Sequence, residues 1–206
     1  MRYSTILFDL DGTLIDSSAW LLGAVNRVLA PWLKAPWTLA DLVATAGAPE
    51  RTVIGRIVPV QKLDSVLADY RRALGEAGSL QMQPGIHEFL SALDAEGYAS
   101  GLFSGAGREL GELRLRLAGW ENRFPVRVWG DETEPKPSPA GILLALKKAG
   151  VETASAIYIG DSQKDLLCAR AAGVRFLGAG WGDEPAGLIG AWVAATPADL
   201  LAQIQA

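Results

Sequence analysis

The chain has 206 residues, half of them hydrophobic, and a formal net charge of −4 at pH 7. This length suits one domain, or one domain with a smaller inserted module, and the apolar content is enough to bury a full core. The negative charge and the lack of a basic stripe argue against nucleic acid as a partner, and no stretch reaches the roughly 18 uninterrupted apolar residues of a membrane helix.

Apolar runs of strand length recur along the chain, and each closes on a polar or glycine-rich turn. They span residues 3–10, 98–104, 126–130, 156–160, 174–178 and 192–194. Their near-continuous apolar character predicts strands that are covered on both faces, as in a parallel sheet. Helical patterns lie between and after these runs, at 86–97, 107–118, 138–150, 163–172 and 197–205. This alternation predicts an α/β fold with a doubly wound parallel sheet, in which the carboxyl ends of the strands share one rim.

The segment between the first two strands breaks the alternation. It contains no convincing strand, but apolar residues at helical spacing mark faces around 21–32, 53–60 and 66–74. We therefore predict an all-helical cap over residues 17–82, inserted into an α/β core formed by residues 1–16 and 83–206. Because the insertion leaves and returns near one place, we expect it to cover the rim as a lid.

Two carboxylates, Asp9 and Asp11, stand where the first apolar strand runs into a Gly-Thr turn. At a strand end they would repel one another unless a cation or a shared proton offsets them. A carboxylate nucleophile needs no deprotonation at neutral pH and can accept a phosphoryl group. A second carboxyl group nearby can protonate the leaving alcohol and then activate water. The pair therefore predicts phosphoryl transfer through a covalent intermediate.

The run from Phe8 to Ser17 (Phe-Asp-Leu-Asp-Gly-Thr-Leu-Ile-Asp-Ser) resembles the first motif of the haloacid dehalogenase superfamily, in its phosphatase branch. The resemblance implies that Asp9 is the nucleophile. It implies that Asp11 is the general acid and base and also binds magnesium through its backbone carbonyl. Members of the dehalogenase branch lack an aspartate at the second position, so Asp11 favours phosphoryl transfer. The inserted cap corresponds to that of phosphoglycolate phosphatase-like relatives.

The second and third motifs of this family follow in order. Ser104 ends the second strand, where the resemblance implies a hydroxyl that binds the transferring phosphoryl oxygens. Gly105, which replaces the asparagine common in relatives, would leave a backbone N–H free to help. Lys136 lies between Pro135 and Pro137, which stiffen its backbone. The resemblance places such a lysine beside the nucleophile, where its charge offsets the carboxylate and the phosphoryl group.

Asp161 ends an apolar strand, and Asp165 follows four residues later, just inside the next helix. Together with Asp9 they offer the hard oxygen ligands that Mg²⁺ prefers. By resemblance Asp161 binds the metal directly, whereas Asp165 either binds through water or orients Lys136. The sequence therefore predicts a magnesium cofactor held by Asp9, Asp11, Asp161 and Asp165.

Substrate selection is expected from the cap, because the core motifs would contact only phosphate and metal. The loop 46–51 corresponds to the cap loop that faces the site in phosphoglycolate phosphatase-like relatives. Arg51 in this loop and Arg108 after the second motif are candidates for binding an anionic group of the substrate.

These features favour a magnesium-dependent phosphatase for a small phosphorylated metabolite. A phosphosugar mutase of the beta-phosphoglucomutase type and a catalytically inactive ligand- or partner-binding protein with this fold are the alternatives. We expect a cytoplasmic monomer or small homo-oligomer without membrane contact, since the single cysteine suits a reducing compartment and the first residues do not form a signal peptide.

Overall fold

The computed structural model describes residues 3–78, 80–183 and 187–205. Six strands form one sheet in the order β5-β4-β1-β6-β7-β8, and every neighbouring pair is parallel. Their bounds are Thr5–Phe8 (β1), Ala99–Phe103 (β4), Val126–Val128 (β5), Ala156–Gly160 (β6), Arg175–Ala179 (β7) and Val193–Ala194 (β8). The sheet confirms the predicted doubly wound α/β fold and places β1, which leads into Asp9, between β4 and β6.

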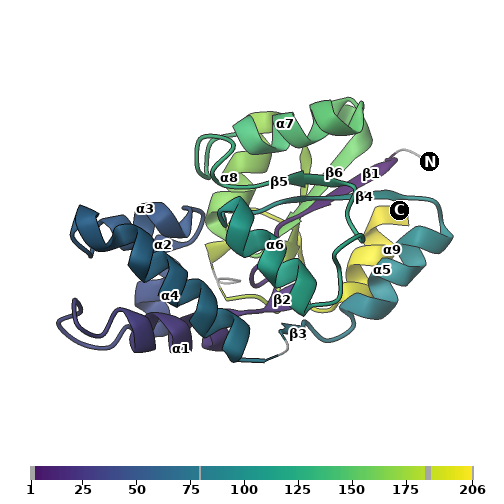
Figure 1. Cartoon of the computed structure of the whole chain (residues 1–206). Helices are drawn as coiled ribbons and strands as arrows, with labels where there is room; N and C mark the ends of the chain where they lie inside the picture. Colours follow the sequence, from purple (N-terminus) through teal and green to yellow (C-terminus); the bar gives the residue numbers. More distant parts are fainter. Residues whose placement is uncertain (1–2, 79, 184–186, 206) are drawn as a thin grey trace.

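Helices cover both faces of this sheet (Figure 1). Successive side chains of a strand point to opposite faces, so Phe8 packs in one core cluster and Leu7 in the other. Leu7 lies with residues of α7 (Ala140–Ala149) and α8 (Gln163–Ala172). Phe8 lies with residues of α5 (Ile86–Ala95), α6 (Arg108–Leu117) and α9 (Pro197–Gln205). None of the helices within the described ranges is long and apolar enough to cross a membrane.

Along the chain, four α-helices follow the first strand before the rest of the core begins. In space they lie together at one side of the sheet (Figure 1). They are α1 (Ser18–Val28), α2 (Leu39–Thr45), α3 (Glu50–Gly55) and α4 (Leu63–Glu76), with a 3-10 turn at Val60–Lys62. Their apolar faces share a cluster that contains Leu21, Ile54 and Tyr70 and is completed by Leu110 of α6. Helix α2 was not expected from the apolar spacing. It begins at Thr38, which forms a capping box with Asp41.

Two short strands join the helical segment to the core. Residues of β2 (Ile15–Asp16) and β3 (Gln81–Met82) pair antiparallel, so the chain leaves and returns at one place. Strands of two residues are too short to give an apolar pattern, which is why the sequence did not predict them. The division into a cap at 17–82 and a core at 1–16 and 83–206 stays a prediction, to which this pairing adds support.

Candidate active site

The predicted motifs meet at the carboxyl ends of three neighbouring strands. Asp9 follows β1, Ser104 follows β4 and Asp161 follows β6. Since β1 lies between the other two strands, the register of the sheet brings these side chains to one point of the rim. All three are nearly buried, with 9 %, 1 % and 4 % of their surface exposed. Ser104 accepts a hydrogen bond from the Ala106 N–H (3.2 Å), which tightens the loop after β4.

Lys136 lies between two carboxylates. Its Nζ is 2.8 Å from Asp9 Oδ1 and 2.7 Å from Asp165 Oδ1, and the side chain is almost completely buried. Burial alone would lower the pKa of Lys136, but the charges and hydrogen bonds of Asp165 and Asp9 outweigh it and raise the pKa. The lysine is therefore a fixed ammonium ion directly beside Asp9.

Asp165 uses both of its oxygens within the protein. Oδ1 accepts from Lys136 and from the Tyr158 hydroxyl (2.8 Å). Oδ2 accepts from the backbone N–H and the hydroxyl of Ser162, in the capping box that begins α8. Burial opposes ionisation, but Lys136 and these hydrogen bonds lower the pKa of Asp165. Of the two predicted roles of Asp165, this geometry supports the orientation of Lys136.

Asp161 belongs to the same acidic group but has no cation of its own. Thr13 Oγ1 donates to Oδ1 (2.8 Å) and the Asp183 N–H donates to Oδ2 (3.0 Å). Burial, with the nearby charges of Asp165 and Asp9, raises the pKa of Asp161 well above its ordinary value. Thr13 was not among the predicted site residues, although it stands within the first motif.

A divalent cation would fit this group. Carboxylate oxygens of Asp9, Asp161 and Asp165 lie within 4.8 Å of one another. The pKa of Asp9 is also raised, to about 7. Burial is the main cause; Lys136 lowers the pKa, and the negative charges of Asp165 and Asp11 raise it further. One lysine does not neutralise the negative charge of these carboxylates. Such a group of hard oxygen donors with excess negative charge is the environment that binds Mg²⁺ or a similar ion.

The sequence reasoning missed Arg114, a buried arginine of α6 that reaches both Asp11 and the helical segment. Its Nε lies 3.0 Å from Asp11 Oδ1 and its Nη2 lies 2.8 Å from Glu50 Oε1. Only 2 % of Arg114 is exposed. Burial would lower its pKa, but Asp11 and Glu50 raise it. A signal was available, because Arg114 stands four residues after Leu110 and therefore shares its buried helical face.

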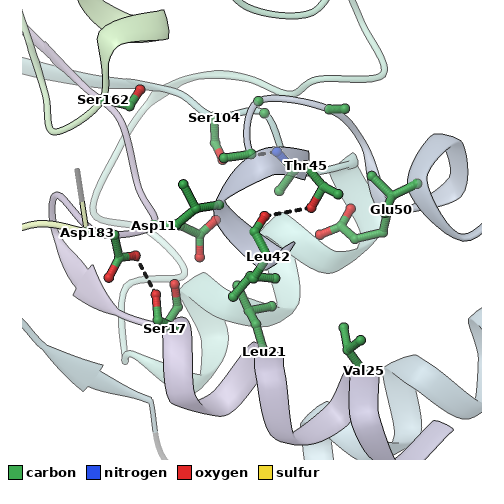
Figure 2. A pocket seen from close by; sticks show the side chains of 18 of the residues that line it. Asp11, Ser17, Leu21, Val25, Leu42, Thr45, Glu50, Ser104, Ser162 and Asp183 are labelled. Atoms are coloured by element: carbon green, nitrogen blue, oxygen red, sulfur yellow. Dashed lines mark hydrogen bonds between the residues drawn. The ribbon is translucent and has the colours of Figure 1, made fainter. Parts of the chain in front are cut away.

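Glu50, at the start of α3, connects the helical segment to the core. Besides Arg114, it accepts a hydrogen bond from the Gly107 N–H (2.8 Å) through Oε2. Figure 2 shows Glu50 extending into the pocket from the side opposite Asp11. The loop before Glu50 also contacts the core, since Lys164 Nζ donates to the Ala46 carbonyl (2.6 Å). The cap loop 46–51 therefore faces the site, as expected from the sequence.

The same loop accounts for Gly105. A Cβ at this position would lie 2.5 Å from the Cα of Gly47 and 3.0 Å from its carbonyl oxygen. The backbone of Gly47 thus occupies the space that a larger residue at 105 would need. Gly105 lines the pocket beside Ser104, where its N–H was expected to help bind phosphate.

Arg51 and Arg108, the two predicted substrate-binding arginines, do not line the pocket in the described part of the chain. The Arg51 guanidinium pairs with Asp64 (2.5 Å) and its side chain is 64 % exposed. Arg108 pairs with Glu132 (2.9 Å) and is 54 % exposed. Each is the residue directly after one that joins the helical segment to the core, Glu50 and Gly107.

The pocket itself lies between the rim of the sheet and the helical segment. It has a cavity volume of about 130 Å³. Its floor contains Asp9, Ser104, Lys136 and Asp161, and its far wall comes from α1, α2 and α3. Figure 2 shows Leu21 and Val25 of α1 and Leu42 of α2 on this wall. A carboxylate paired with a lysine lies here beside a hydroxyl and a second carboxylate, under a largely apolar wall, which is an arrangement suited to an enzyme that acts on phosphate esters.

Comparison with known proteins gives the family. Residues 6–179 match the haloacid dehalogenase-like hydrolase model. A phosphoglycolate phosphatase of Xanthomonas campestris pv. campestris (strain 8004) is 33 % identical over 193 residues, which cover 88 % of this chain and 86 % of the relative. A pyrophosphatase PpaX of Bacillus velezensis is 28 % identical over 183 residues, covering 87 % and 84 %. The chain belongs to the haloacid dehalogenase-like hydrolase family and is an enzyme of its phosphatase branch.

A solved structure shows the same fold. The crystal structure of CbbY from Rhodobacter sphaeroides in complex with phosphate superimposes with a TM-score of 0.83 at 23 % identity, covering 99 % of this chain and all of the other. At this identity the likeness concerns the fold.

Proposed function

We propose that this enzyme hydrolyses the phosphate monoester of a small metabolite through an aspartyl-phosphate intermediate at Asp9, with Mg²⁺ as cofactor. The observation that carries the proposal is the contact of Lys136 Nζ with Asp9 Oδ1 at 2.8 Å. A fixed cation beside a buried carboxylate holds it in place and offsets the charge of an incoming phosphoryl group. The relatives are named for different substrates, phosphoglycolate and pyrophosphate, and have phosphate release in common.

The reaction divides into two displacements at phosphorus. In the first, an Asp9 oxygen forms a bond to phosphorus as the bond from phosphorus to the ester oxygen breaks, and Asp11 donates a proton to the leaving alkoxide. In the second, Asp11 takes a proton from a water molecule as its oxygen attacks phosphorus, which releases phosphate and regenerates Asp9. Ser104 and the backbone of Gly105 are placed to bind the phosphoryl oxygens beside Asp9.

The metal ligands would be Asp9, Asp161 and the backbone carbonyl of Asp11. A bound Mg²⁺ would offset the negative charge of the phosphoryl group and of the carboxylates. Asp165, whose oxygens are already occupied, orients Lys136 and contributes to the metal site through its charge or through water.

The structure argues against the two alternatives. A mutase that rebinds a sugar bisphosphate needs cationic groups on the cap side, and none of the described residues there offers one to the pocket. An inactive binding protein would be expected to have lost part of the machinery, yet Asp9, Asp11, Lys136 and Asp161 all line the pocket. A cytoplasmic monomer or small homo-oligomer acting on a small phosphorylated metabolite remains our prediction.

The test is release of inorganic phosphate from phenyl phosphate with and without Mg²⁺. We expect turnover that depends on the metal and is lost, by at least about a thousandfold, in Asp9→Asn. A wild-type protein treated with beryllium fluoride and Mg²⁺ should bind the fluoride complex at Asp9, whereas the variant should not. Undiminished turnover in Asp9→Asn would remove this residue from the nucleophile role.

A further inference from the structure

The pocket contains only two cationic side chains among the described residues that line it, Lys136 and Arg114. Both are already paired. Lys136 lies between Asp9 and Asp165, at 2.8 and 2.7 Å. Arg114 lies between Asp11 and Glu50, at 3.0 and 2.8 Å. Lys136 lies at the Asp9 end of the pocket, and Arg114 lies beside Asp11, the proposed proton donor to the leaving group.

Arg114 cannot serve a substrate anion in this arrangement. Its side chain is 3 % exposed. Its Nε and Nη1 atoms have no hydrogen-bond partner among the described residues, but both are buried, so a substrate anion could reach them only if neighbouring side chains moved. Two carboxylates face one guanidinium, so the group as a whole carries no excess positive charge. Glu50, which pairs with Nη2 of Arg114, is held in place from a second side by the Gly107 N–H.

No other described cation is directed into the leaving-group space. Arg51 pairs with Asp64, Arg108 pairs with Glu132, and Lys164 donates to the Ala46 carbonyl. An anionic substituent there would instead lie near the carboxylates of Glu50, Asp11 and Asp183, which line the pocket. Placing like charges together away from bulk water is unfavourable, and an unpaired buried anion costs far more than a paired one.

Most of the rest of this space is apolar, although Ser17, Ser18, Thr45 and Tyr70 also line the pocket. The far wall is formed by side chains of the helical segment, of which the partly exposed ones are Trp37, Leu42, Val43 and Val53. Such a surface favours a ligand that removes hydrocarbon from water and adds no charge.

Building on the proposed phosphatase activity, we propose that the substrate is the phosphate monoester of an uncharged, largely apolar alcohol, and that Glu50 excludes leaving groups with a second anionic group by adding a negative charge to the Arg114–Asp11 pair. Glu50 is thus a specificity-determining residue. An ester such as 2-phosphoglycolate, for which the Xanthomonas relative is named, would bring a carboxylate next to Glu50.

The first experiment compares two isosteric esters, 2-phosphoglycolate and the phosphate ester of glycolamide, which differ only in the anionic charge. We expect kcat/KM for the amide to exceed that for the acid by at least about tenfold. In the series ethyl, propyl and butyl phosphate, kcat/KM should rise by about two- to fourfold per methylene until the cavity is filled. Equal or better turnover of the acid, or a flat alkyl series, overturns the proposal.

The second experiment uses Glu50→Gln, which keeps the shape and an acceptor oxygen but removes one of the two negative charges that face Arg114. The amide-to-acid ratio of kcat/KM should fall by at least about fivefold, because losing the Glu50 charge leaves Arg114 balanced by Asp11 alone and weakens the repulsion of the substrate carboxylate. Asp64→Asn is the matched control, since it removes one negative charge from an exposed position of the helical segment and should leave the ratio unchanged. An unchanged ratio in Glu50→Gln contradicts the role of Glu50.

These outcomes separate the specificity from the activity itself. A ratio of two substrates measured on one preparation does not depend on the fraction of folded enzyme, so partial loss of stability in Glu50→Gln leaves it interpretable. If neither ester nor phenyl phosphate is hydrolysed by the wild type, the proposed phosphatase function fails. If esters are hydrolysed but the acid is preferred, only the inference about the leaving group fails.

Discussion

Gly105 lies directly against Gly47, so the loop after β4 and the loop before α3 touch through their backbones. A Cβ on Gly105 would come within 2.5 Å of the Gly47 Cα, which is backbone and cannot rotate away. The two glycines therefore allow the helical segment to rest on the phosphate end of the site. The contact also explains why glycine replaces the asparagine expected after Ser104.

Replacing Gly105 by alanine should displace this loop. We expect Gly105→Ala to reduce kcat/KM for phenyl phosphate by about tenfold or more, because a shift of about 1 Å at reacting groups is costly. Gly23→Ala is the control. Gly23 lies in α1 with nothing within 4 Å of its ideal Cβ, so the change should stabilise the protein by about 0.5–1 kcal/mol and leave turnover unaltered. Full activity in Gly105→Ala would show that the loop contact is dispensable.

Removing the charge of Asp165 should weaken both the fold and the site. Asp165→Asn leaves the buried Lys136 with one carboxylate instead of two, and we expect the free energy of unfolding to fall by about 3 kcal/mol. Urea denaturation measures this loss. Asp199→Asn is a useful comparison, because Asp199 bonds Thr196 at the start of α9 in an equivalent manner but is exposed. A loss no larger than that in Asp199→Asn would mean that Lys136 does not depend on Asp165.

The raised pKa of Asp9 predicts how stability changes with pH when no metal is bound. Its carboxyl group has an ordinary pKa of 3.8 in the unfolded chain and about 7 in the folded protein. Between these values the folded state binds more protons, so its stability falls as pH rises from about 4 to about 7. Thermal unfolding in EDTA should show this fall, and Asp9→Asn should make it smaller. A wild-type slope no steeper than that of the variant would contradict the assignment.

Metal should reverse this trend. Since Mg²⁺ binds the ionised carboxylates, it should raise the unfolding temperature more at pH 8 than at pH 5. The comparison requires only protein with EDTA and with excess Mg²⁺ at the two pH values. An equal shift at both would indicate that the metal binds elsewhere.

Arg114 should be strongly coupled to Glu50. Arg114→Met leaves Glu50 and Asp11 without their cation, and we expect a loss of about 3–5 kcal/mol in the free energy of unfolding. The double variant Arg114→Met/Glu50→Gln should recover part of it, because one of the two uncompensated charges is gone. A double-mutant cycle measures the coupling, and additive losses would show that the pair is energetically independent.

Much of the core could be predicted from sequence because its elements are encoded locally. Each long strand is a continuous apolar run, and Asp9, Ser104 and Asp161 directly follow such runs. Parallel strands then bring these residues to one rim, as the structure shows for β1, β4 and β6. The pair of strands β2 and β3 was missed because strands of two residues are too short to show an apolar period. Helix α2 was missed because its seven residues include none that is buried.

The sequence by itself determined the fold class, the helical insertion and the residues that meet Asp9, because motif, strand end and turn lie within a few residues of one another. Only the tertiary structure decided which cap residue enters the site. Neighbouring residues of a helix point about 100° apart, so Glu50 faces Arg114 while Arg51 turns outward to Asp64. The Glu50–Arg114 and Gly47–Gly105 contacts join segments far apart in the chain, and such contacts depend on how separate elements pack rather than on any local pattern.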